Sequence, residues 1–523
     1  MTDQIHHRCD GPQQQVIAFL SRPESYGTSG NVERIDTHIS HIFLAGDRAF
    51  KLKRAVALDY LDFSTPAKRH TACETELRLN RRTAPDLYLE VLSIKCAVDG
   101  NLGFDHGRPI DWLVVMRRFA SDDLLEAVAR RGELTAPMVN RLADIIAQFH
   151  QSLDPVDAID GSRRLIRILD ENHKCLMQHA DQIFPNAPIQ SLFDDSRAKL
   201  ATLSSLLDER AAQGHIRHGH GDLHLANICL WKGEPTLFDC LEFNAELATT
   251  DMLYDLAFLL MDLWQSGLRV QANELLNRYL YMADEQADGI AVLPLFLSMR
   301  AAIRAHVSAA QAMLADDDQD SKRLINKAND YLTGALAFLS GSKPRLIAIG
   351  GLSGTGKSTL ARAIAPLVGR PLGARLLRTD ILRKRLFGVK PETHLEADAY
   401  GREQGEKVYA KLMEDVAAAL AAGWTVVADG VFAKRSERDA ISRIAETYQI
   451  PFAGFWLEAP LQQMRSRVEQ RIGDASDAGC DVIERQLGYE IGDLDEWTII
   501  DSSAGPQEVS GAVLSFLLDG EPL

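Results

Sequence analysis

The chain carries the octapeptide GLSGTGKS at residues 351–358, directly after the apolar run LIAI at residues 346–349 and before the helical stretch TLARAI at residues 359–364. Glycines at both ends let the backbone curl with its N–H groups pointing inward, and the following helix directs the positive end of its dipole at phosphate oxygens. Lys357 is expected to reach the β- and γ-phosphates, and Ser358 to ligate Mg²⁺. The stretch therefore predicts a nucleoside triphosphate site at a strand-to-helix junction. Its expected lining is Gly351, Ser353, Gly354, Thr355, Gly356, Lys357, Ser358 and Thr359.

Apolar runs of strand length alternate with helical stretches in the last third of the chain. The runs are residues 346–350, 374–379, 424–429, 452–457 and 498–500. This alternation is typical of a doubly wound parallel sheet, which binds ligands at the carboxyl ends of its strands. The small polar string SGSKP at residues 340–344 precedes the first run and predicts an interdomain linker. We therefore expect a separate P-loop domain over residues 345–523.

Two acids stand at strand ends in this predicted domain. Asp380 follows the run LLRT at residues 376–379, where a catalytic carboxylate can meet an acceptor hydroxyl, and Asp429 ends the run TVVAD and should approach Mg²⁺. Gly430 comes next, at a position where a motor ATPase usually has a glutamate that activates water. The pattern therefore favours a kinase over a motor ATPase.

Arginines recur at near-helical spacing within residues 464–471, and a stretch rich in Asp, Ala and Gly follows. A mobile lid that brings Arg467 and Arg471 onto the transferring phosphoryl group has this pattern. A solvated helix face has it too, so both interpretations stay open.

The string TDILRKRL at residues 379–386 is the most specific feature after the phosphate loop. With it, residues 345 to about 503 resemble the P-loop kinases of the gluconate-kinase and polynucleotide-kinase type, which are often described as AAA-like ATPases. The resemblance implies ATP and Mg²⁺ as cofactors and a hydroxyl group as the acceptor.

A second phosphoryl-transfer motif lies upstream. Residues 220–227, HGDLHLAN, fit the catalytic-loop pattern H-x-D-L-x-x-x-N, and LFD follows at residues 237–239. Asp222 is the expected base for a substrate hydroxyl, while Asn227 and Asp239 must lie opposite it to hold Mg²⁺ against the triphosphate. The four histidines within residues 215–224 could suggest zinc, but no cysteine or acid completes a ligand set.

The segment around this motif has the plan of a kinase. Residues 15–118 are strand-rich and residues 119–339 mostly helical in pattern, which predicts a small β-lobe and a helical lobe within a domain over residues 1–339. Residues from about 36 to 263 resemble the aminoglycoside phosphotransferase family of kinase-like enzymes. The resemblance implies ATP-dependent transfer to a small-molecule hydroxyl, with Asp255 as the acid that braces the catalytic loop.

The lysine that pairs the phosphates has two candidates in this lobe. Lys51 and Lys53 lie on the same face of one predicted strand, and the match to the kinase strand slightly favours Lys53. Its acidic partner is Glu74 or Glu76 on the following helix. No G-x-G-x-x-G precedes the strand and no Phe-Gly follows Asp239, departures that weaken a protein-kinase interpretation more than a small-molecule one.

The composition is that of an ordinary globular protein: 523 residues, 46% of them hydrophobic and 25% charged. The formal net charge of −16 repels phosphodiester backbones, so small molecules are better substrates than nucleic acids. Seven scattered cysteines have no paired spacing and indicate reduced thiols. The amino terminus lacks a basic stretch followed by an apolar one, and no apolar run is expected to reach bilayer length. We expect a soluble, cytoplasmic protein.

Fusion of the two parts in this order resembles a bacterial family of two-domain proteins described as aminoglycoside phosphotransferase and ATP-binding protein. The expected fold class is α/β and α+β: a two-lobed kinase-like fold followed by a P-loop kinase fold. The leading hypothesis is a bifunctional ATP-dependent kinase that phosphorylates hydroxyls of small molecules, sugar-like ones among them. Two alternatives stay open: a regulator with one inactive ATP-binding domain, and a nucleic-acid end kinase, suggested by the basic residues 383–385. One sequence does not locate the side chains that choose an acceptor.

Overall fold

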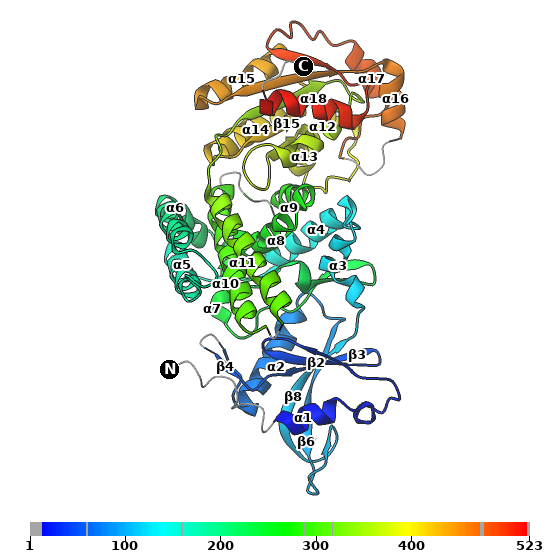
Figure 1. The fold of residues 1–523 in the computed structure, drawn as a ribbon. Coiled ribbons are helices and arrows are strands. Elements are labelled where there is room, and N and C mark those ends of the chain that lie inside the picture. Colours follow the sequence, from blue (N-terminus) through cyan, green and yellow to red (C-terminus); the bar gives the residue numbers. More distant parts are fainter. Residues whose placement is uncertain are drawn as a thin grey trace. The chain divides into compact units, whose positions relative to one another are not determined.

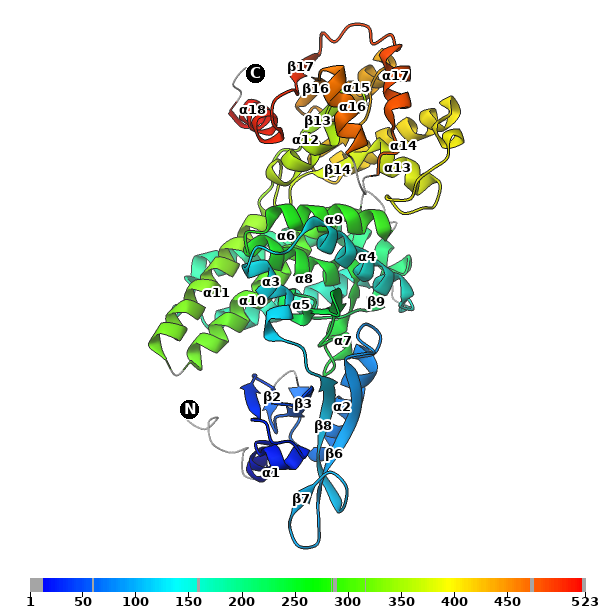
Figure 2. The same ribbon diagram turned by 90° about the vertical axis from the view of Figure 1, so that its right-hand side faces the viewer.

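The computed structural model describes residues 13–58, 61–157, 160–283, 285, 289–315, 317–470 and 475–519. The chain forms two compact units, drawn as ribbons in Figures 1 and 2. The first consists of Met1–Ala158 with Gln213–Leu259, and the second of Ile159–Ala212 with Leu260–Leu523. One predicted phosphate site therefore lies in each unit.

The first unit begins with a six-stranded sheet in which all neighbouring strands are antiparallel. The strand order is β1-β2-β3-β8-β6-β7. The strands are β1 (Glu33–Asp36), β2 (Ser40–Ala45), β3 (Arg48–Lys53), β6 (Tyr88–Cys96), β7 (Leu102–Gly103) and β8 (Arg108–Arg117). Around them are α1 (Gln13–Leu20), η1 (Pro23–Tyr26), the small hairpin β4 (Ala57–Leu58) and β5 (Leu61–Asp62), and α2 (Pro66–Asn80).

The apolar and the basic side chains of β3 lie on opposite faces of the sheet. Phe50 and Leu52 pack with residues of α1 in one apolar cluster. Lys51 and Lys53 project from the other face, toward α2, and are only 7% and 0% exposed. Because successive side chains of a strand alternate between faces, both lysines reach the same site.

The catalytic-loop motif lies among short elements that complete the first unit. They are η2 (Ser121–Asp123), α3 (Leu125–Arg130), α4 (Ala136–Ser152), β9 (Ile216–His218), η3 (Leu225–Asn227), β10 (Ile228–Trp231), β11 (Glu234–Leu237), α7 (Ala245–Ala248) and β12 (Thr249–Asp251). In the hairpin of β10 and β11, Ile228 faces Leu237. Lys232 and Gly233 close it with positive φ angles of 54° and 83°, as a two-residue type I′ turn requires.

Helices precede the P-loop domain in the second unit. They are α5 (Gly161–Met177), α6 (Asn186–Ala212), α9 (Arg269–Met282), η4 (Gly289–Val292), α10 (Leu293–Met313) and α11 (Asp318–Leu339). Helix α8 (Met252–Gln265) begins in the first unit and ends in the second. Helix α10 lies at the centre of this helical part, against α5, α6 and α11.

The segment Gly289–Met313 is long and apolar enough to cross a membrane by length and composition, with a mean hydropathy of 1.4. The prediction that no apolar run reaches this length was therefore wrong. In the structure 72% of the apolar 18-residue window within this segment is buried inside the protein. Its apolar surface is explained by packing against other helices, because a helix that is hydrophobic all round is covered by its neighbours.

The P-loop domain contains a five-stranded, all-parallel sheet, as the alternation of runs predicted. The strand order is β14-β15-β13-β16-β17, so the strand before the phosphate loop is central. The strands are β13 (Leu346–Gly351), β14 (Arg375–Arg378), β15 (Val426–Asp429), β16 (Phe452–Glu458) and β17 (Trp497–Asp501). The helices are α12 (Lys357–Ile364), η5 (Ala365–Leu367), α13 (Thr379–Leu386), η6 (Ala397–Tyr400), α14 (Arg402–Ala421), α15 (Arg435–Tyr448), α16 (Leu461–Glu469), α17 (Cys480–Leu487) and α18 (Pro506–Asp519).

The predicted linker, residues 340–344, joins α11 to β13 without helix or strand. The division into compact units nevertheless falls elsewhere, because the helices over residues 159–212 and 260–339 group with the P-loop domain. The polar string at residues 340–344 therefore connects two parts of the same compact unit.

Candidate active sites

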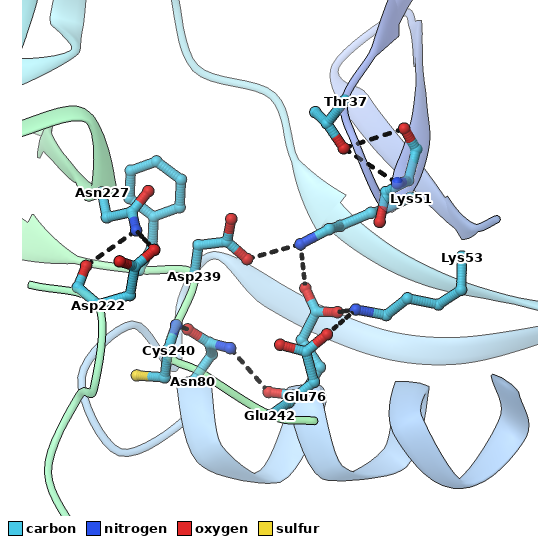
Figure 3. Close-up of polar contacts among 12 residues, drawn as sticks. Thr37, Lys51, Lys53, Glu76, Asn80, Asp222, Asn227, Asp239, Cys240 and Glu242 are labelled. Carbon is cyan, nitrogen blue, oxygen red and sulfur yellow. Dashed lines mark hydrogen bonds and ion pairs between the residues drawn. The ribbon is translucent and has the colours of Figure 1, made fainter. Parts of the chain in front are cut away.

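In the first unit, the two lysines of β3 and one acid of α2 form a buried cluster (Figure 3). Lys51 Nζ lies 2.8 Å from Glu76 Oε1 and 2.6 Å from Asp239 Oδ1. Lys53 forms ion pairs with both Glu76 and Glu242. Glu74 lies apart from this cluster, with a side chain that is 62% exposed and paired with His70. Of the two predicted acids, Glu76 is the one that meets the lysines.

Charge complementarity holds this cluster together. Burial lowers the pKa of Lys51, but Asp239 and Glu76 outweigh it and raise that pKa well above its usual value. Burial raises the pKa of Glu76, but Lys51 and Lys53 outweigh it and lower that pKa to about 2. At neutral pH the lysines are therefore cations and Glu76 an anion. Burial dominates at Glu242, whose pKa is raised.

The β10–β11 hairpin brings the predicted metal ligands together. Phe238 N donates to Asn227 O at 3.0 Å, so Phe238 lies opposite Asn227 in the hairpin. Asp239 is the next residue after Phe238 and therefore lies close to Asn227. Asp239 has a positive φ of 60°, and its carboxylate lies between Asn227 and Lys51 in Figure 3. Asn227 Nδ2 donates to Asp222 Oδ2 at 2.9 Å, which holds the predicted base and leaves the amide oxygen for a metal. Half-exposed carboxylates and an amide oxygen suit Mg²⁺, which prefers oxygen ligands.

Asp255 braces the catalytic loop from the start of α8. Its carboxylate is fully buried and accepts hydrogen bonds from His220 N and Gly221 N, both at 2.8 Å. His150 Nε2 lies 3.2 Å from the same carboxylate. Gly221 has a φ of 82°, and a Cβ there would lie 2.8 Å from a side-chain atom of Leu241, so the loop needs glycine. His150 was not identified from the sequence, since it lies 105 residues from Asp255 without a motif of its own.

In the second unit, the residues of GLSGTGKS form the curl that the sequence predicts. Gly351, Gly354 and Gly356 have positive φ angles of 133°, 84° and 95°. A Cβ at Gly354 would lie 2.5 Å from the carbonyl oxygen of Met464, so no larger residue fits there. Helix α12 begins at Lys357, so its first free N–H groups and the positive end of its dipole lie at the loop.

The end of β15 meets this loop. Ser358 Oγ donates to Asp429 Oδ2 at 2.6 Å, and Arg378 Nε donates to the same oxygen at 3.1 Å. Hydroxyl and carboxylate oxygens at a phosphate loop fit Mg²⁺, which keeps few protein ligands and binds phosphates too. Arg378 was not identified from the sequence, although its place two residues before Asp380 at a strand end was a usable signal.

A cleft of about 1620 Å³ opens beside the phosphate loop. Asp380 lies on its wall near the start of α13. Burial is the largest influence on Asp380 and raises its pKa, although Arg378 and Lys357 oppose it. Pockets for one small ligand usually measure about 300–1,000 Å³, so this cleft has room for a nucleotide and an acceptor together.

Arg467 of α16 lies against the phosphate loop. Its Nη1 is 3.4 Å from Thr355 O, and its Nη2 donates to Ser502 O at 2.7 Å. Arg471 lies outside the described residues. Gln486, which the sequence analysis did not identify, accepts a hydrogen bond from Ser353 N at 2.7 Å. Within the described ranges, no group of three or more His, Cys, Asp and Glu side chains is arranged to hold a metal ion.

The chain is similar in sequence to one family model and to a full-length relative. The model of a family described as AAA domain matches residues 346–490. An uncharacterised protein of Mycobacterium tuberculosis (strain ATCC 25618 / H37Rv) is 31% identical over 482 residues, which are 91% of this chain and 93% of the relative.

Two solved structures each resemble one part of the chain. A choline/ethanolamine kinase family protein from Mesorhizobium loti is 16% identical and covers 63% of this chain and 99% of its own, with a TM-score of 0.38. A gluconokinase from Sinorhizobium meliloti 1021 is 23% identical and covers 34% of this chain and 95% of its own, with a TM-score of 0.25. The chain belongs to the family of the mycobacterial protein, and its residues 346–490 match the AAA domain model.

Proposed function

We propose that this ATP-dependent kinase is bifunctional, with one ATP–Mg²⁺ site in each compact unit and a small-molecule hydroxyl as the acceptor at both. The observation that carries the proposal is that the candidate site of each unit contains a lysine, side-chain oxygens that could bind a metal, and a further carboxylate. The first set is Lys51, Asn227, Asp239 and Asp222, and the second is Lys357, Ser358, Asp429 and Asp380. Phosphoryl transfer needs positioning and charge neutralisation, which such sets supply.

In the first unit we assign the phosphate-binding role to Lys51 and not to Lys53. Lys51 reaches Asp239, the proposed metal ligand, whereas Lys53 is 0% exposed and pairs with Glu76 and Glu242. Asn227 and Asp239 would hold Mg²⁺, which would supply charge neutralisation for the phosphates. Asp222, held by Asn227, then accepts the proton of the acceptor hydroxyl as the hydroxyl oxygen attacks the γ-phosphorus. The bond between that phosphorus and the β–γ bridging oxygen breaks, and ADP leaves.

In the second unit Ser358 and Asp429 would hold the metal, which again neutralises phosphate charge. Lys357 and the loop N–H groups hold the phosphates. Asp380 accepts the proton of the second acceptor hydroxyl, and Arg467 beside the loop stabilises the charge on the transferring group.

Acceptor-dependent release of ADP from purified protein, measured with Mg²⁺–ATP and a panel of sugars and aminocyclitols, tests this function. Two activities that are lost separately in Asp222→Asn and Lys357→Ala are the expected result. Tight nucleotide binding by calorimetry without turnover on any acceptor would instead favour the regulatory alternative.

Lys357→Ala is expected to lower transfer in the P-loop unit by about 10²–10³-fold, because one fixed cation at the transferring group is lost. Transfer in the first unit should stay unchanged. Lys343→Ala is the matched control, since Lys343 is an exposed lysine of the linker. Equal loss of both activities, or no loss at all, would contradict the assignment of Lys357.

The activity of the second unit is expected to be lost on the acidic side with a midpoint above the pKa of an ordinary aspartate, which is about 4. Asp380 must be deprotonated to act as a base, and its pKa is raised by burial. Activity should therefore fall earlier as the pH is lowered. Rates measured from pH 4 to 9 check this, and the residual activity of Asp380→Asn should lack this loss on the acidic side.

A further inference from the structure

Helix α9 covers the free edge of the parallel sheet. Strand β14 pairs with β15 on one side only. On its other side, Leu376 N donates to Asn277 Oδ1 at 2.9 Å, and Asn273 Nδ2 donates to Ala374 O at 2.9 Å and to Leu372 O at 2.7 Å. Two asparagine side chains thus take the place of a neighbouring strand and satisfy an edge that would otherwise stay open.

The same helix also holds the loop that follows α13. Arg278 forms a bidentate pair with Glu392, with Nη1–Oε1 at 2.5 Å and Nη2–Oε2 at 3.2 Å. The Arg278 side chain is only 10% exposed. Tyr281 Oη donates to Val389 O at 2.6 Å. Figure 2 shows α9 beside the end of the P-loop domain that carries β14 and α13.

A third contact comes from η4, the next helical element after α9. Trp424 is fully buried, and its Nε1 donates to Ile290 O of η4 at 3.1 Å. Trp424 stands two residues before β15, the strand that ends in Asp429. Helix α9 therefore contacts β14, the strand that leads to Asp380, and η4 contacts Trp424, just before the strand that ends in Asp429.

We propose that α9 is a positioning element of the P-loop site, with Asn277 and Arg278 as its positioning residues. Helix α13 starts where β14 ends and stops just before the loop with Val389 and Glu392, so α9 holds the chain on both sides of α13. Asp380 is the second residue of α13, and release of either side lets its carboxylate move relative to the phosphate loop. The proposal rests on the proposed function of Asp380. It implies that the position of the Asp380 carboxylate in the cleft depends on helices that precede residues 340–344.

Hydrogen–deuterium exchange of the full-length protein tests the positioning without a substrate. Arg278→Ala is expected to speed amide exchange in residues 379–396 by about two- to thirtyfold, the range that coupled contacts of this kind span. The charge-reversed pair Arg278→Glu with Glu392→Arg should restore slow exchange. Lys407→Ala is the matched control, because it removes an ion pair with Glu403 on the exposed face of α14.

Kinetics give a second readout, which loss of general stability would not reproduce. In Arg278→Ala the kcat of the P-loop unit should fall while the KM for ATP stays constant, and the charge-reversed pair should recover kcat. Tyr281→Phe removes a single hydrogen bond, and kcat should fall by a smaller factor at constant KM for ATP. This variant replaces Arg278→Ala in the test if Arg278→Ala does not fold. Unchanged exchange in residues 379–396, or unchanged kcat, overturns the positioning role. Altered exchange in a protein that phosphorylates no acceptor overturns the proposed function and leaves the positioning role standing.

Discussion

Replacing Asp222 with asparagine is expected to lower phosphoryl transfer in the first unit by about 10²–10⁴-fold, the usual contribution of a positioned base. Asparagine has nearly the same shape and can still meet Asn227, whose Nδ2 lies 2.9 Å from Asp222 Oδ2. The loop should therefore keep its conformation, because Asp255 holds it through the backbone at His220 and Gly221. Only the capacity to accept the hydroxyl proton is removed.

The measurement is kcat and the KM for ATP in the Asp222→Asn variant, with the dissociation constant of Mg²⁺–ADP as a check on the nucleotide site. We expect kcat to fall while the other two values change little. Asp86→Asn is the matched control, since Asp86 is 66% exposed and paired with Lys232 at the surface. Unchanged kcat in Asp222→Asn would refute the role of Asp222 as the base.

The features that could be predicted from the sequence are those confined to short, continuous segments. The phosphate loop is one: its glycines, Lys357 and Ser358 fall within eight residues, and the strand before it and the helix after it are as expected. The proximity of Asp222 and Asn227 is another, because both belong to one eight-residue motif, and Asn227 Nδ2 lies 2.9 Å from Asp222 Oδ2. Such segments fix their own geometry, so local spacing carries the information.

The choice between alternatives two residues apart could not be made from the sequence. On a helix, Glu74 and Glu76 point about 160° apart, so only one can face β3. Helix α2 has acidic and basic residues on several faces, so no apolar stripe indicates which side turns inward. On β3 the difficulty is that Lys51 and Lys53 lie on the same face and both reach Glu76, so the alternation of the strand does not separate them. What distinguishes them is Glu242, which lies 189 residues from Lys53 in sequence.

The contacts of α9 show a second limit of sequence patterns. Asn273 and Asn277 are one helical turn apart, which in a sequence is typical of a solvated helix face. In the structure Asn273 is 3% exposed and bonded to backbone of the P-loop domain, 99 residues away. The free backbone groups of an edge strand can bond to many kinds of polar side chain, so no residue pattern identifies α9 as the partner of β14. The predicted linker at residues 340–344 also gave no indication that α9 packs against the P-loop domain.

Replacing Lys53 with methionine is expected to destabilise the first unit by about 3–5 kcal/mol, the usual cost of removing one partner of a buried ion pair. Lys53 is 0% exposed, and its ammonium group is shared between Glu76 and Glu242. Without it, two buried carboxylates keep one ammonium group, that of Lys51. Methionine fills a similar volume, so the loss is one of charge and not of packing. Urea denaturation followed by a spectroscopic probe of the first unit measures the change.

The double variant Lys53→Met with Glu242→Leu separates charge from shape. It removes a cation and an anion together and leaves Lys51 paired with Glu76 at 2.8 Å. Because apolar replacement of a whole buried pair is often neutral, most of the lost stability should return. Lys51→Met should behave differently: it should weaken transfer with a smaller loss of stability, since Lys51 faces Asp239, whose carboxylate is 38% exposed to water. If Lys53→Met instead keeps full stability and loses ATP binding, Lys53 is the phosphate-binding lysine and the assignment to Lys51 is wrong.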